Sequence, residues 1–80
     1  FVTNSKTLED DENVVIITVA TYDQNLTEDY INDIGEKTTI NNITGYLEDQ
    51  SFFALFSYIQ DNDLVIVTAN DKNLIEEVLS

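Results

Sequence analysis

The clearest strand pattern in this chain lies at residues 14–22, which read Val-Val-Ile-Ile-Thr-Val-Ala-Thr-Tyr. The run is rich in β-branched residues and carries apolar side chains at both alternating sets of positions, as expected for a strand buried on two faces. Two further runs also carry apolar side chains at both alternating sets of positions, at residues 51–59 and 64–69. We therefore expect three well-defined strands of one sheet.

The segment that follows the first strand has the period of a surface helix. Its apolar positions are Leu26, Tyr30, Ile31 and Ile34. Asn25 and Glu28 have the spacing of an N-cap and its reciprocal capping partner, and Gly35 is a natural stop. A weaker strand, short or bulged, is expected at residues 38–47, where Gly45 interrupts the apolar pattern.

A second helix is expected at the end of the chain. Asn70 is a suitable N-cap, and the inward positions are Leu74, Ile75, Val78 and Leu79. Short polar turns separate the last strands and predict an antiparallel meander. The predicted fold class is α+β: a four-stranded, mainly antiparallel sheet in the order β-α-β-β-β-α, with two helices packed on one face.

Eighty residues are enough for one hydrophobic core only. We expect residues 1–13 to be an acidic N-terminal segment, because Glu9, Asp10, Asp11 and Glu12 are consecutive like charges that stay solvated. Residues 14–80 are expected to be a single α/β domain. The chain lacks methionine and starts at Phe1, so we also expect it to be a fragment of a longer chain.

The composition removes much of the usual chemistry of enzymes. The chain has no Cys, His, Met, Trp or Pro, so it offers no thiolate, no imidazole and no disulfide. A calcium loop counted from Asp23 would need glycine where Glu28 stands and glutamate where Ile34 stands. The sequence therefore predicts no catalytic residue, no metal site, no cofactor and no enzymatic activity.

The charge of the chain indicates which partners it would accept. Sixteen acidic residues stand against Lys6, Lys37 and Lys72, which gives a net charge of -13. Direct nucleic-acid binding is not expected, because phosphate contacts are made chiefly by Lys and Arg. A field of this sign favours cationic partners or keeps the protein soluble. No apolar stretch approaches the ~20 residues of a membrane span, so no membrane insertion by this segment is expected. The composition assigns no compartment.

One face of the predicted sheet has no cover, because two helices can pack on one face only. The apolar positions assigned to the uncovered face are Phe53, Leu55, Ile59, Val15 and Ile17. A large exposed apolar patch usually marks an interface, so we expect a homodimer or a protein partner there. Alternatively, the N-terminal segment folds across this face, or the twisted strands share one core.

The predicted function is a non-catalytic, acidic protein–protein interaction or self-association module of a larger protein. Glu28, Asp29 and Asp33 on the expected first helix are further candidate interaction residues. One alternative is a small acidic inhibitor that mimics nucleic acid and binds a basic groove, with Glu36, Asp61 and Asp63 completing its carboxylates. Another alternative is an extracytoplasmic sensor or surface domain.

Overall fold

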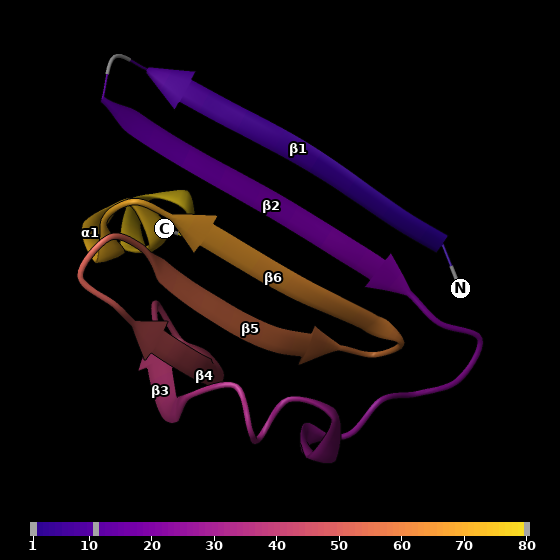
Figure 1. The fold of residues 1–80 in the computed structure, drawn as a ribbon. Coiled ribbons are helices and arrows are strands. Elements are labelled where there is room, and N and C mark those ends of the chain that lie inside the picture. Colours follow the sequence, from indigo (N-terminus) through magenta and orange to yellow (C-terminus); the bar gives the residue numbers. More distant parts are fainter. Residues whose placement is uncertain (1, 11, 80) are drawn as a thin grey trace.

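The protein is a single antiparallel sheet of six strands with one short helix on it (Figure 1). The computed structural model describes residues 2–10 and 12–79, and Phe1, Asp11 and Ser80 lie outside the described residues. The strands pair in the order β1-β2-β6-β5-β4-β3. Their bounds, with those of the 3-10 turn η1 and the helix α1, are β1 Val2–Asp10, β2 Asn13–Thr21, η1 Glu28–Tyr30, β3 Glu36–Ile40, β4 Ile43–Asp49, β5 Ala54–Gln60, β6 Asp63–Ala69 and α1 Lys72–Leu79.

The predicted four-stranded sheet with two helices on one face is wrong. The first difference lies at residues 38–47, which form β3 and β4 rather than one weak strand. Asn41 and Asn42 turn the chain between them, with φ of 50° and 70°. Asparagine tolerates this left-handed conformation, and two such residues in a row match the right-handed twist of a hairpin. The asparagines that looked like an interruption therefore create an additional strand.

The second difference is the helix expected at residues 26–34, where the structure has only the three-residue turn η1. Asn25 does not cap it; Thr27 precedes η1 and makes no side-chain capping hydrogen bond. Two physical reasons favour the open form. Asn and Asp side chains compete with helical hydrogen bonding, and the connection must run from β2 to β3 at the far edge of the sheet. An extended chain covers about twice the distance per residue of a helix.

The third difference is at the N-terminus, where the expected acidic N-terminal segment contributes the strand β1. β1 pairs with β2 along all nine of its residues, from Val2 opposite Thr21 to Asp10 opposite Asn13. Without β1, the apolar strand β2 would be the edge of the sheet. Polar β1 covers that edge. An uncovered apolar edge strand tends to pair with other chains.

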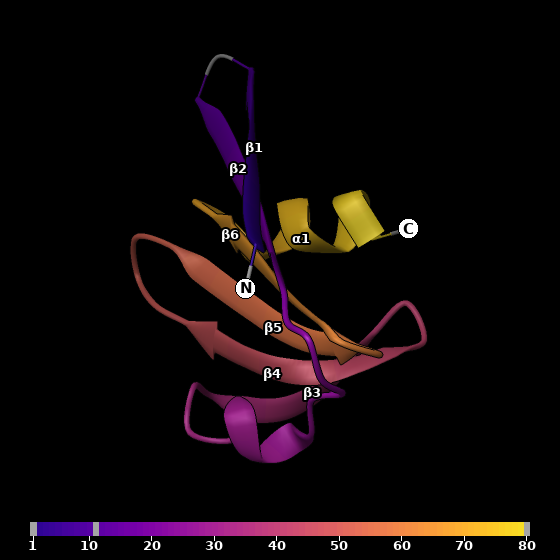
Figure 2. The same cartoon turned by 90° about the vertical axis from the view of Figure 1, so that its right-hand side faces the viewer.

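The core lies between the sheet and α1 (Figure 2). Ile75 of α1 is fully buried over the sheet, and beneath it Ala54 and Ala69 leave room for the helix. The helix begins one residue later than expected, because Asp71 rather than Asn70 accepts a hydrogen bond from the amide of Asn73, at 2.8 Å. Asn70 instead ties the β1–β2 hairpin to β6: its Oδ1 accepts a hydrogen bond from the Val14 amide, at 3.0 Å.

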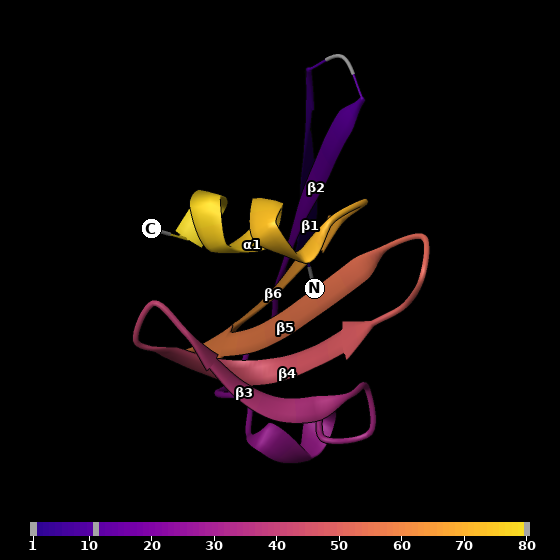
Figure 3. The same ribbon diagram turned by 90° about the vertical axis from the view of Figure 1, so that its left-hand side faces the viewer.

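The opposite face of the sheet is partly covered by the chain between β2 and β3 (Figure 3). The Leu26 amide donates to the Asp61 carbonyl at 3.2 Å, which holds this connection against the β5–β6 turn. Leu26 and Ile31 are buried, Ile31 with only 2% of its surface exposed. Residues 22–35 thus supply part of the cover for this face, where the sequence predicted a homodimer or a protein partner.

Candidate functional site

The five apolar candidate residues do not share one surface. Val15 and Ala54 both pair with Ala69, so Val15 shares a face with Ala54 and not with Leu55. The α1 face therefore receives Val15 and Ile17, both of which pack in or against the core. Leu55 and Ile59 of β5 point to the opposite face and are half-buried, whereas Phe53 precedes β5 and is exposed. The structure does not bring the predicted patch together.

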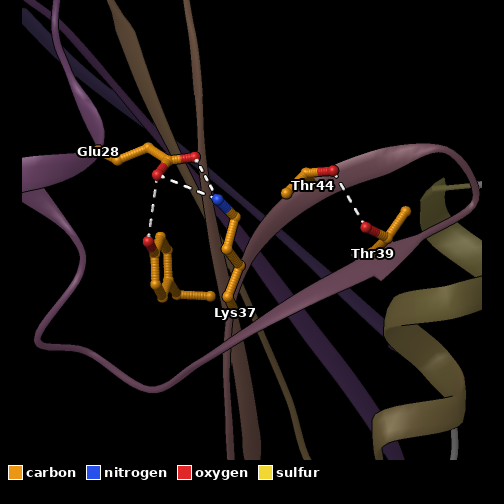
Figure 4. Close-up of polar contacts among 5 residues, drawn as sticks. Glu28, Lys37, Thr39 and Thr44 are labelled. Carbon is orange, nitrogen blue, oxygen red and sulfur yellow. Dashed lines mark hydrogen bonds and ion pairs between the residues drawn. The ribbon is translucent and has the colours of Figure 1, made fainter.

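The three acidic candidates lie in or just after η1. Glu28 is engaged within the chain: its carboxylate is 3.2 Å from Lys37 Nζ and accepts a hydrogen bond from Tyr46 Oη at 3.3 Å (Figure 4). Asp29 and Asp33 are exposed. Because no regular helix forms here, these carboxylates are not arranged in the row that the predicted helix would have provided. The ion pair lies at the surface, where such pairs contribute little to stability.

The feature that the sequence analysis missed is the outer edge of β1. All nine residues of β1 are exposed, and in the described part of the chain only β2 pairs with it. Its backbone N–H and C=O groups along the other edge therefore point to solvent. The acidic run hid the strand, although Val2, Thr3 and Thr7 are β-formers and the length of β1 matches that of β2. A segment as long as β2 that directly precedes it in the chain was the available indication of a hairpin.

A groove lies between the β1–β2 hairpin and α1. It has a volume of about 200 Å³. Four apolar side chains contribute to its lining, from β1, β2 and α1: Leu8, Val15, Leu74 and Val78. Polar and acidic residues complete the lining, namely Glu9, Asp10, Asn13 and Glu77. The groove thus combines an apolar lining with polar and acidic residues around it.

Among residues 2–10 and 12–79, no three Asp or Glu side chains converge in a way that could hold a metal ion. Burial raises the pKa of the Tyr58 phenol. In the same residues no helix is long and apolar enough to cross a membrane.

Comparisons with family models, with curated proteins and with solved structures gave no match. The class of protein is therefore defined by its own architecture: a small six-stranded antiparallel sheet with one helix, an acidic surface and an open edge strand.

Proposed function

We propose that this chain is a non-catalytic protein-binding module that accepts an extended segment of a partner protein along β1. The observation that carries the proposal is the outer edge of β1, which is nine residues long and unpaired within the part of the chain that the structure describes. Strand addition at an exposed edge is a common mode of peptide recognition, with backbone hydrogen bonds supplying affinity and alternate side chains supplying specificity.

The form of β1 supports this role. Edge strands of soluble proteins are usually short, bulged, charged (most often by lysine) or interrupted by proline. β1 is long, its register with β2 is unbroken over nine residue pairs, and it contains no proline. Lys6 is the only charged residue before Glu9, so most of the edge is uncharged. These properties leave the backbone accessible to an incoming strand.

The other edge of the sheet is a weaker candidate for this role. β3 has only five residues, and the connection that contains η1 runs beside it (Figure 3). Lys37 of β3 is held by Glu28 of η1, and Ile40 is buried in the core. A partner strand would find fewer open backbone groups there than along β1.

The lack of Cys and His and the absence of a converging carboxylate cluster among the described residues support a binding role over a catalytic one. Each cross-strand side-chain pair contributes roughly 0.2–1 kcal/mol. A single added strand buries less surface than a standard stable interface, so we expect a transient complex.

Amide hydrogen exchange on the isotope-labelled chain tests the proposal. The chain is mixed with three seven-residue peptides of high strand propensity, one basic, one neutral and one acidic. We expect at least one peptide to slow exchange at the outward amides of β1, whereas amides of β3 are unchanged. If all three leave β1 unprotected at peptide concentrations near 1 mM, which corresponds to about 4 kcal/mol of binding free energy, the proposal is wrong.

Two proline variants provide the control for this experiment. Ser5→Pro and Lys6→Pro are adjacent, and amides of adjacent strand residues point to opposite edges. One variant removes an outward amide and keeps the ladder with β2, whereas the other breaks that ladder. The variant that retains the circular dichroism spectrum of the parent should lose peptide binding.

A further inference from the structure

The chemistry of the partner follows from the charges and side chains around β1, and this inference rests on the function proposed above. The net charge of the chain is -13. Glu9, Asp10 and Glu12 lie at the turn end of the β1–β2 hairpin, which projects from the body of the sheet (Figure 2). A partner segment that runs beside this end meets carboxylates on the strand and around the groove.

A second copy of this chain is a poor occupant of the edge. Two copies would bring together two bodies of the same large negative charge. In the antiparallel register that overlaps all nine residues of both β1 strands, each Lys6 would lie directly opposite the other. Like charges in directly opposite positions destabilise a strand pair. The charges therefore favour a different chain, and a cationic one.

The alternation of β1 defines where the cationic residues of the partner should lie. Leu8 pairs with Val15 and faces α1, so Asp10 is on the same face as Leu8 and Glu9 is on the other. A strand added next to β1 alternates in the same way. Residues opposite Asp10 and Glu9 are adjacent in the partner and lie on different faces. Two consecutive Lys or Arg residues would meet both carboxylates.

The groove determines the next position of the partner. Leu8 is 40% exposed and forms the outer end of an apolar lining that continues through Val15 to Leu74 and Val78 of α1. A partner residue opposite Leu8 stands on the α1 face of the sheet. An aliphatic side chain there would cover Leu8 and extend the apolar lining at the mouth of the groove.

We infer that β1 accepts, antiparallel to itself, a cationic partner segment in which two consecutive Lys or Arg residues are followed by an aliphatic residue. The basic pair lies opposite Asp10 and Glu9, and the aliphatic residue lies opposite Leu8 beside the groove. The second residue after the aliphatic one lies opposite Lys6 and is uncharged or acidic. All other strands of the sheet pair antiparallel, and an antiparallel partner continues that hydrogen-bonding pattern.

The test uses a synthetic peptide, acetyl-Thr-Lys-Lys-Val-Thr-Val-Thr-amide, with a fluorescent label, and measures its affinity for the full chain by anisotropy. Two matched peptides accompany it: one with both lysines replaced by glutamine, and one with the sequence reversed, which has the same composition and charge. We expect the first peptide to bind about fivefold more tightly than either control. This advantage over the glutamine peptide should shrink as salt is raised.

Variants of the chain locate the peptide. Glu9→Gln with Asp10→Asn should remove the preference for lysine over glutamine. Asp29→Asn with Asp33→Asn makes the same change of charge elsewhere on the surface and should leave that preference in place. Leu8→Thr should weaken binding of the parent peptide more than binding of a peptide in which the first valine is threonine, because only the parent peptide loses an apolar contact.

The outcomes separate this inference from the proposed function. If the glutamine or reversed peptide binds equally well and slows exchange at β1, the inference is wrong and the proposed function stands. If the chain forms dimers in sedimentation experiments and β1 becomes protected without peptide, the occupant is a second copy and the inference is overturned. If Asp29→Asn with Asp33→Asn removes the preference for lysine over glutamine, the peptide binds elsewhere on the chain and the inference is wrong. If no peptide protects β1, the proposed function itself is wrong.

Discussion

Gly45 of β4 and Phe56 of β5 are in such close contact that a Cβ added to Gly45 would lie 2.8 Å from Phe56 Cζ. The backbone oxygen of Ser57 would also obstruct the added carbon. Phe56 is fully buried, so its ring has little freedom to move away. Gly45 is therefore required by the packing of the aromatic core rather than by an unusual backbone conformation.

We expect Gly45→Ala to lower the free energy of unfolding by about 1–3 kcal/mol, as overpacked core positions do. Alanine also restricts the unfolded chain, which offsets a few tenths of a kcal/mol of this loss. Urea unfolding measures the change. Thr44→Ser, at an exposed neighbour in β4, is the control, because it keeps the hydroxyl that hydrogen-bonds Thr39. A Gly45→Ala chain as stable as the parent would contradict the close contact.

Ser57→Ala should leave stability unchanged or raise it by about 1 kcal/mol. Ser57 is fully buried, and its Oγ has no hydrogen-bond partner among the described residues. An unpaired buried hydroxyl loses its hydration without compensation, so its removal is favourable. Thermal unfolding followed by circular dichroism measures the effect. A marked loss of stability would mean that the hydroxyl has a partner in solution.

Asn70→Ala should loosen the β1–β2 hairpin without unfolding the sheet. The Asn70 amide group receives a hydrogen bond from the Val14 amide and donates one to the Glu12 carbonyl. Two such bonds contribute about 1–3 kcal/mol together. We expect faster hydrogen exchange at Val14 and along β1, with smaller changes in β5. Asn73→Ala, at an exposed asparagine of α1, is the matched control, and equal effects of the two variants would refute the tether.

Ile31→Ala should cost about 2–4 kcal/mol and increase the binding of a hydrophobic dye, because Ile31 is buried where residues 22–35 cover the sheet. Val2→Ala, at a valine that is 62% exposed, should change little. If both variants behave alike, residues 22–35 do not cover this face in solution, and the exposed face becomes available to a partner.

High pH should destabilise the protein through Tyr58. Burial raises the pKa of the Tyr58 phenol above its ordinary value of about 10. The folded state therefore favours the neutral phenol. This contribution to stability is complete below pH of about 10 and is lost as the pH rises through the higher pKa of the folded protein. Absorbance titration of tyrosinate should show a late component, and Tyr58→Phe should abolish it.

Local pattern was sufficient for the strands with continuous apolar character. The run at residues 14–22 became β2, Asn13–Thr21, and the run at residues 64–69 became β6, Asp63–Ala69, because β-branched side chains favour the pleated conformation without reference to distant residues. The meander of β5 and β6 and the terminal helix were also visible, since polar turns and a 3.6-residue period are local features.

Strand pairing, in contrast, depends on residues far apart in the chain. Polar β1 has no pattern of its own that requires a strand; it is held in place by the open edge of β2. Residues 26–34 have a helical period, but the distance from β2 to β3 across the sheet favours an extended connection. Val15 and Leu55 were assigned to one surface because the alternation within each strand is local, whereas the register between strands is not. The open edge and the groove beside it arise from that register, so only the tertiary structure could reveal them.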